Sequence, residues 1–528
     1  MLFKTTGHFL FQAVLIFVTG SFIFSCSGIK KNKTHQNISN ENIERGKQLA
    51  AIYCGNCHML PDPSLLGSKN WENGVLPAMG PRLGIFFYGF KEYPSSMNDK
   101  YIGKNYYPSK QVIGFVDWQN IIDYYTSLSP DSLIIPQREV AVKSNDQLFS
   151  IEKAAGLKTI PATCLVKINT QNLPNQLLIG DVMSRALYCF NEKFERIDSF
   201  KTSSPVVDVD FNGKEMITTN IGVMGPNNGR FGEAMKVSFN SLGKMVSDSS
   251  LQMEKLGRPV QTTKVDINKD GKDDYVVCEF GNLIGALSWM ENMGNNKFER
   301  HIIREVPGAI KTYISDVNHD GLPDIWALFA QADEGIFLFT NKGNGKFDQE
   351  QVLRFPSIYG SSFFEMIDFN KDGHPDIIYT CGDNADYSAV LKPYHGIYIF
   401  LNDGTNHFKQ KYFFPMHGCY KALARDFDGD GNLDIAAISF FADYKNHPEE
   451  SFIYLENKGD YKFQPYSIPG TECGRWLTMD AGDIDGDGKT DLVLGNFSLA
   501  PSFIKSSFDW KTGPPFLILK NKIKSAKL

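Results

Sequence analysis

The segment Cys54-Gly55-Asn56-Cys57-His58 contains the residues of this chain best suited to redox chemistry. Two thiols separated by two residues can each bond to one of the two vinyl groups of a porphyrin, and the adjacent imidazole can then ligate the iron. The pattern therefore predicts one covalent haem c, with Cys54 and Cys57 as attachment residues and His58 as the proximal axial ligand.

Two methionines are candidates for the distal axial ligand, because a thioether is a common sixth ligand that raises the reduction potential. Met79 lies in the segment from Trp71 to Gly84, and Met97 ends the run Tyr93-Pro94-Ser95-Ser96-Met97. We favour Met79, with Met97 as the alternative and an open or otherwise ligated iron as the third option. Either methionine could instead fill the core around the porphyrin.

Five segments further along the chain share a nine-residue pattern with oxygen-bearing side chains at positions 1, 3, 5 and 9 and glycine at position 6. Such a loop can surround one hard cation, with a backbone carbonyl at position 7 as a further ligand. The pattern predicts about five structural Ca²⁺ ions. The predicted ligands are Asp266, Asn268, Asp270, Asp274, Asp316, Asn318, Asp320, Asp324, Asp368, Asn370, Asp372, Asp376, Asp426, Asp428, Asp430, Asp434, Asp483, Asp485, Asp487 and Asp491.

The pattern recurs every 50 to 58 residues, which indicates an array of similar units. Short β-type runs flank each loop, and the glutamate that an EF-hand needs at position 12 is missing. Two upstream segments, Asp208–Gly213 and Lys167–Asn175, keep part of the pattern, so we count seven units. Seven small antiparallel sheets can close radially into a propeller.

The amino terminus has the features of an export signal. Residues 1–25 combine Lys4 with an apolar run, and Ile23-Phe24-Ser25-Cys26 resembles the lipobox of bacterial lipoproteins. The resemblance implies lipidation of Cys26, and Ser27 favours an outer-membrane anchor, facing the periplasm or the surface. We interpret residues 26–42 as a polar tether.

Two further resemblances complete the expected domain organisation. Residues 43–135, with helices expected over Ile43–Tyr53 and Trp118–Leu128, resemble a monohaem cytochrome c domain, and the Met79 segment resembles a Trp-x-x-x-x-Leu-Pro-x-Met-Gly signature of cytochrome domains fused to repeats. The five loops resemble FG-GAP/VCBS repeats of integrin-like propellers. We therefore expect a multidomain chain, with a small all-α cytochrome c domain followed by an all-β seven-bladed propeller over residues 145–522.

The net charge of −6 gives no indication of nucleic-acid binding, and no nucleophile motif, phosphate loop or zinc cluster is recognisable. We expect a membrane-anchored electron-transfer protein whose propeller docks a redox partner protein. A glycan- or protein-binding propeller with auxiliary haem and a haem-linked oxidoreductase acting on a sugar-like substrate are the alternatives. Arg258, Lys311, Lys421 and Arg475 could ring one mouth of the channel and receive an anionic or polyhydroxylated ligand, or be solvated strand ends.

Overall fold

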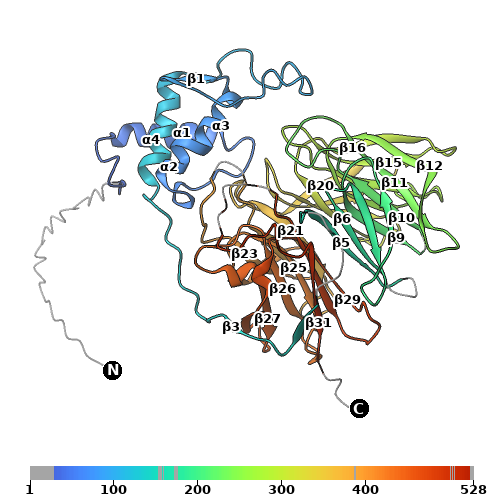
Figure 1. Cartoon of the computed structure of the whole chain (residues 1–528). Helices are drawn as coiled ribbons and strands as arrows, with labels where there is room; N and C mark the ends of the chain where they lie inside the picture. Colours follow the sequence, from blue (N-terminus) through green and yellow to red (C-terminus); the bar gives the residue numbers. More distant parts are fainter. Residues whose placement is uncertain are drawn as a thin grey trace, which may run out of the picture.

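The computed structural model describes residues 29–523, apart from 153–156, 158–159, 172–175, 214, 386–387, 500, 502–503 and 505. A mostly helical segment lies to one side of a set of β-sheets (Figure 1). The export signal and Cys26 lie outside the described residues. Among the described residues, no helix is long and apolar enough to span a membrane.

The helical segment contains α1 (Asn40–Tyr53), α2 (Ser68–Asn70), α3 (Leu76–Met79) and α4 (Phe115–Leu128), with a π-helical turn at Trp71–Val75. Both expected helices are present, and each begins three residues earlier than predicted. The segment is not all-α, because a hairpin of β1 (Phe87–Tyr88) and β2 (Lys91–Glu92) joins the helices.

Helices α1 and α4 cross at close range because Gly46 lies at their contact. A Cβ atom at position 46 would come within 1.8 Å of the Asn120 carbonyl oxygen. Around this crossing, Leu49, Trp118 and Ile121 are buried in one apolar cluster. The packing fixes the carboxyl end of α1, where Cys54 follows directly.

The expected tether is part of this folded segment over residues 29–39. Ile29 and Ile38 pack against the helical core, and the Asn32 backbone N–H donates to the Ser127 carbonyl oxygen at 2.8 Å. Residues 29–39 are therefore packed on the helices, because two partly buried isoleucines among the polar side chains contact the helical core.

The remaining chain forms seven four-stranded antiparallel sheets, the blades of a β-propeller, whose first strands contact one another in sequence around the ring. Blades 1 and 2 consist of β5 (Thr163–Asn169), β6 (Gln176–Asp181), β7 (Ala186–Phe190) and β8 (Arg196–Lys201), then β9 (Val206–Asn212), β10 (Glu215–Asn220), β11 (Gly232–Phe239) and β12 (Met245–Leu256). Blades 3 and 4 consist of β13 (Pro259–Val265), β14 (Asp274–Glu279), β15 (Ala286–Asn292) and β16 (Phe298–Arg304), then β17 (Ala309–Ser315), β18 (Asp324–Phe329), β19 (Gly335–Asn341) and β20 (Phe347–Arg354).

Blades 5 to 7 complete the ring. They consist of β21 (Ser361–Ile367), β22 (Asp376–Cys381), β23 (Gly396–Asn402) and β24 (Phe408–Pro415), then β25 (Cys419–Arg425), β26 (Asp434–Ser439), β27 (Phe452–Asn457) and β28 (Phe463–Ser467), and finally β29 (Trp476–Gly482), β30 (Asp491–Asn496) and β31 (Phe516–Asn521). The fourth strand of blade 7 is β4 (Phe149–Glu152), which precedes blade 1 in the chain and pairs with β31, while β3 (Lys143–Ser144) extends blade 6. The ring is thus closed by the segment that follows the helices.

A repeated hydrogen bond joins neighbouring blades near the axis. Asp210, Glu365 and Asp480 occupy one register position on the first strands of blades 2, 5 and 7. Each carboxylate accepts the backbone N–H of the next blade's first strand, from Lys264 (2.9 Å), Ala424 (2.8 Å) and Ile168 (2.8 Å) respectively. Such charge-assisted bonds hold adjacent blades in register.

The two degenerate units have a different register from the one expected. Lys167, Asn169, Asp208 and Asp210 lie on the inner strands β5 and β9, before the turn rather than in it. Asn212 pairs directly with Glu215, so Glu215, and not Met216, occupies the position of the ninth loop residue. Polar residues that alternate along a strand have the same two-residue spacing as the loop ligands, which explains the error.

Candidate metal centres

The Cys54–His58 segment leaves helix α1 in a tight turn. The Cys54 N–H donates to the Ala50 carbonyl oxygen at 2.8 Å, and the Cys57 N–H donates to the Cys54 carbonyl oxygen at 3.2 Å. Cys54 is half-buried, Cys57 is exposed, and neither forms a disulfide. Burial, with a smaller contribution from Cys57, raises the pKa of Cys54 to about 11. Cys54 therefore carries a protonated thiol at neutral pH.

The His58 imidazole is oriented by its own backbone neighbourhood. Its Nδ1 donates to the Met59 carbonyl oxygen at 2.9 Å. Because a carbonyl only accepts, Nδ1 carries the proton and Nε2 carries the lone pair. This tautomer is the one that a metal-ligating histidine usually adopts.

The two candidate distal ligands differ in their surroundings. Met79 ends helix α3 and packs against the helical core cluster, whereas the Met97 side chain is 56% exposed. The backbone after Met79 is also fixed, since a Cβ at Gly80 would come within 2.4 Å of the Tyr93 ring. Met79 is thus held against the core and Met97 is largely in solvent.

Aromatic side chains stiffen the core beneath these residues. The rings of Trp71 and Tyr125 lie 4.4 Å apart, and Trp71 Nε1 donates to the Pro63 carbonyl oxygen at 2.9 Å. Trp118 Nε1 donates to the Tyr93 hydroxyl at 3.2 Å. Two thiols on one turn, an imidazole with a lone pair at Nε2 and a partly buried thioether together fit the donor set of a covalent haem.

The five aspartate-rich loops follow the inner strands of blades 3 to 7, as predicted. Blade 7 is representative: Asp483 accepts the backbone N–H groups of Asp487 (3.1 Å) and Gly488 (2.9 Å) through its two carboxylate oxygens. The glycine at position 6 has a positive φ in every loop, 82° in the case of Gly488. The backbone of the loop thus wraps around the first carboxylate, as a cation-binding loop requires.

The ninth residue of each loop has a structural role that the sequence did not reveal. Asp274, Asp324, Asp376, Asp434 and Asp491 are fully buried. Each accepts two backbone N–H groups, one from the second loop residue and one from the asparagine that ends the third strand. The residue therefore fastens the loop to the blade through two hydrogen bonds.

Blades 6 and 7 bring three carboxylates together. Ligand oxygens of Asp426, Asp428 and Asp434 lie within 4.8 Å of one another, and so do those of Asp483, Asp485 and Asp491. Burial, together with neighbouring carboxylates, raises the pKa of Asp434 to about 7 and that of Asp491 to about 6. A bound divalent cation would relieve this crowding of like charges.

The basic residues expected around the channel mouth do not form an open ring. Arg475 is 1% exposed, with its guanidinium 3.8 Å from the centre of the Phe440 ring. Arg258 Nη1 donates to the Gly281 carbonyl oxygen at 2.6 Å. Lys421 Nζ donates to the Met479 carbonyl oxygen at 2.7 Å, and burial lowers the pKa of Lys421 to about 8.

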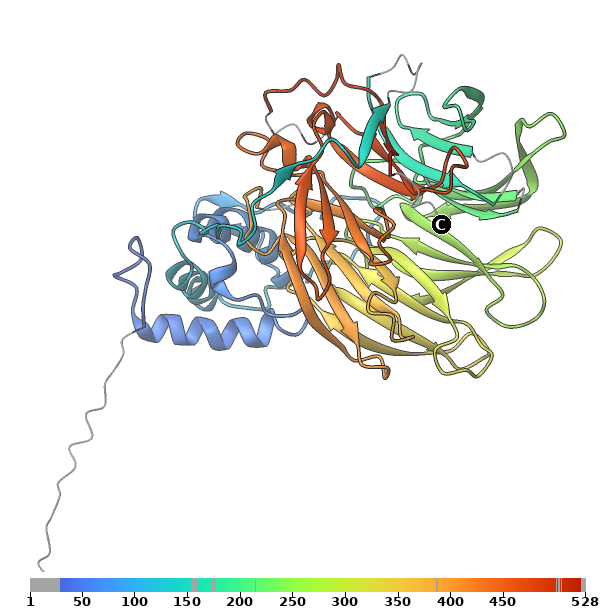
Figure 2. The same ribbon diagram turned by 90° about the horizontal axis from the view of Figure 1, so that it is seen from below.

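The helical segment contacts the face of the propeller opposite the aspartate-rich loops. The Tyr106 hydroxyl donates to the Leu283 carbonyl oxygen (3.1 Å) and the Tyr394 hydroxyl to that of Leu65 (3.1 Å). Leu283 and Tyr394 belong to the loops between second and third strands. Figures 1 and 2 both show the helices beside the orange part of the propeller.

A partly buried ion pair joins the linker to the propeller. The Arg138 guanidinium pairs with both carboxylate oxygens of Glu450, and its Nε donates to the Pro415 carbonyl oxygen at 2.9 Å. From there the chain continues into β3 and β4. The helices are therefore fastened to blades 5 to 7 along this linker.

The FG-GAP-like repeat family matches residues 266–327, 316–379 and 426–494, and all five aspartate-rich loops lie inside these matches. This chain contains FG-GAP-like repeats in a seven-bladed β-propeller. A curated relative, the T-cell immunomodulatory protein homolog of Plasmodium falciparum (isolate 3D7), is 24% identical over 243 residues. The match covers 38% of this chain, and the chain spans about a third (33%) of the relative's length.

Solved structures similar to this chain include Saccharomyces cerevisiae Sqt1, with 9% identity, a TM-score of 0.42, and coverage of 72% of this chain and 100% of that one. Another is virginiamycin B lyase from Staphylococcus aureus, with 10% identity, a TM-score of 0.43, and coverage of 70% and 98%. The propeller assignment is based on the strand pairing and the repeats themselves.

Proposed function

We propose that this protein is an exported, lipid-anchored c-type cytochrome that transfers electrons, with a calcium-loaded propeller that docks its redox partner. The observation that carries the proposal is the Cys54–His58 turn, where two unoxidised thiols stand beside an imidazole whose Nδ1 is bonded to the Met59 carbonyl. Bound haem would supply a one-electron couple at its iron.

The surrounding residues would hold the haem in place. Cys54 and Cys57 would fix the porphyrin to the end of α1, while the His58–Met59 bond would keep the imidazole ring at one angle. Met79, packed against the helical core, is the proposed distal ligand. Because the α1–α4 crossing is tight at Gly46, the ligands would move little between oxidation states.

The propeller is the proposed docking platform. FG-GAP-like propellers indicate ligand or protein binding, and here the helical segment is bonded to the propeller through Tyr106, Tyr394 and the Arg138–Glu450 pair. A partner bound to the propeller would consequently be held at a fixed position relative to the haem. Calcium in the five loops would have a structural role, since each loop is fastened into its blade by its ninth residue.

The test is anaerobic reduction of the purified, haem-loaded protein, followed by absorbance. Reduced redox proteins from the same compartment should reduce the haem, and sugars alone should not. Reduction by a sugar without a protein partner would contradict the transfer role and favour an oxidoreductase.

The lipid anchor would also determine where the haem lies. Cys26 comes shortly before residues 29–39, which pack on the helices. A lipid on Cys26 would therefore hold the haem close to the membrane surface.

A further inference from the structure

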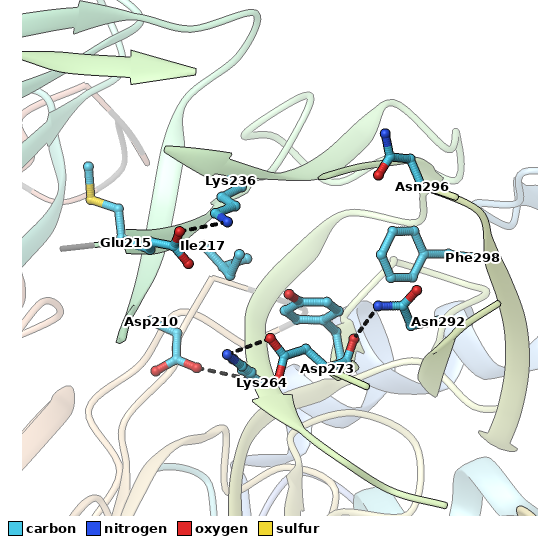
Figure 3. Close-up of a pocket in the computed structure, with 11 residues that line it drawn as sticks. Asp210, Glu215, Ile217, Lys236, Lys264, Asp273, Asn292, Asn296 and Phe298 are labelled. Carbon is cyan, nitrogen blue, oxygen red and sulfur yellow. Dashed lines mark hydrogen bonds and ion pairs between the residues drawn. The ribbon is translucent and has the colours of Figure 1, made fainter. Parts of the chain in front are cut away.

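A cavity of about 210 Å³ lies between blades 2 and 3, beside the aspartate-rich loop of blade 3, to which Asp273 of its lining belongs. Figure 3 shows its polar side chains pointing toward one another from both blades. Apolar clusters fill the space between neighbouring blades, and here one of them includes Ile217 of blade 2 and Tyr275 of blade 3. The cavity lies beside this cluster, where the two blade faces carry charged residues.

Lys236 is a charged residue at a register position that is apolar in the other six blades. It lies on the third strand opposite the third residue of the second strand, Ile217. The equivalent residues are Cys189, Trp289, Leu338, Ile399, Tyr454 and Ile518, all buried. A lysine here replaces part of the apolar contact between blades with a polar wall.

Lys264, on the opposite wall of the cavity, is also a charged residue at a register position that is apolar in the other six blades. It lies on the first strand of blade 3 opposite the second residue of the second strand, Tyr275. The equivalent residues in the other blades are Ile168, Phe211, Ile314, Met366, Ala424 and Ala481. Both blades therefore depart from the repeat pattern at the same interface, each by acquiring a lysine.

Each lysine is paired with a carboxylate at the cavity. Lys236 Nζ lies 2.8 Å from Glu215 Oε1, and Lys264 Nζ lies 2.6 Å from Asp273 Oδ2. Asp210 also lines the cavity, so two ammonium groups face three carboxylates. This balance disfavours an anionic ligand and offers alternating donors and acceptors, an arrangement that suits hydroxyl groups, which both donate and accept.

Aromatic rings supply the apolar part of the lining. The rings of Tyr275 and Phe298 lie 5.8 Å apart in an edge-to-face arrangement. The exposed Asn296 adds an amide group at the rim. An aromatic surface beside paired charges can bind a ring with C–H groups on its face and hydroxyls on its edge.

We infer that the cavity between blades 2 and 3 binds a neutral, polyhydroxylated ring of monosaccharide size. The Lys236–Glu215 and Lys264–Asp273 pairs hydrogen-bond its hydroxyls, and Tyr275 and Phe298 contact its apolar face. The cavity is smaller than the roughly 300–1,000 Å³ of drug-sized sites, so it accepts one ring and not an extended glycan. This inference does not depend on haem.

The test is saturation-transfer NMR of the full-length, calcium-loaded protein with D-glucose, D-galactose, D-mannose and N-acetyl-D-glucosamine. At least one sugar should receive saturation. Lys236→Leu, which restores the residue type of the other blades, should weaken its binding at least tenfold. The matched control is Lys409→Leu on the exposed face of β24, which should bind as the wild type does.

Asn296→Ala at the exposed rim gives a second variant that leaves the blade interface intact, and it should weaken binding by a smaller factor. The inference is overturned if none of the four sugars binds the wild type, or if Lys236→Leu retains wild-type affinity while folded. Competition of the sugar signal by inorganic phosphate would also overturn it, because the site would then be an anion site.

Discussion

The backbone N–H of Asn521 donates to Asp491 Oδ1 at 2.9 Å, and so joins the end of β31 to the last residue of the blade 7 loop. The second oxygen of Asp491 accepts the Ile484 N–H at 3.3 Å. Asp491 is thus both a structural fastener and a proposed calcium ligand. Asp487, in the same loop, is exposed, and its carboxylate accepts from the backbone and the side chain of Lys489.

Substitution of these two aspartates should separate the two roles. Asp491→Ala leaves two backbone N–H groups without their acceptor, so it should lower stability by about 3 kcal/mol with or without calcium. Asp487→Asn keeps the turn and should lower the thermal midpoint only when calcium is present. Thermal unfolding in calcium and in chelator measures both. Equal midpoints for Asp487→Asn and wild type in calcium would contradict calcium binding in blade 7.

Removal of calcium from the wild type should lower the unfolding temperature of the propeller before haem absorbance changes. The reason is that crowded carboxylates, such as Asp426, Asp428 and Asp434, repel one another without a cation. Calorimetry and haem absorbance can be recorded on one sample. Readdition of Ca²⁺ should restore the midpoint, and a midpoint insensitive to chelator would refute the five-site proposal.

The distal ligand can be assigned with two methionine variants. Met79→Ala should abolish the sulfur–iron charge-transfer band and lower the reduction potential, because a thioether favours the reduced iron. Met97→Ala should preserve both, since that side chain is largely in solvent. Absorbance and potentiometric titration provide the readout. The opposite pattern would assign Met97, and two unchanged spectra would leave neither methionine on the iron.

His395 should make stability depend on pH. Burial, and then the neighbouring Lys392 and His417, hold its pKa well below 6.5 in the folded protein. Below pH 6.5 the unfolded chain binds a proton that the folded protein does not, so stability should fall by up to about 1.4 kcal/mol per pH unit. Denaturant unfolding from pH 7 to 5 should show a shallower slope for His395→Gln. The exposed His407→Gln is the control, and identical slopes for wild type and His395→Gln would contradict this account.

The aspartate-rich loops could be predicted from the sequence, because residues close together in the chain, such as Asp483 and Gly488, determine the conformation of each loop. The number of blades could be predicted because the loop pattern recurs at a regular spacing. Asp208 and Asp210 were expected in a loop but lie on strand β9. Polar residues that alternate along a strand have the same two-residue spacing as the ligands of a loop. The burial of Arg475 could not be predicted from the sequence. Its side chain lies against Phe440 of another blade, and that contact depends on how the ring of blades closes. Lys236 and Lys264 are isolated lysines in the sequence, and only strand pairing reveals that they face each other across one interface.

The most direct test of the central claim is whether haem is covalently attached at Cys54 and Cys57. Full-length protein is produced in a host that exports and matures c-type cytochromes, then denatured and analysed by intact mass and by the absorbance of its reduced pyridine complex. We predict one haem per chain, retained after denaturation, and its loss in Cys54→Ser/Cys57→Ser. A well-folded wild-type chain with no covalent haem under these conditions would contradict the account.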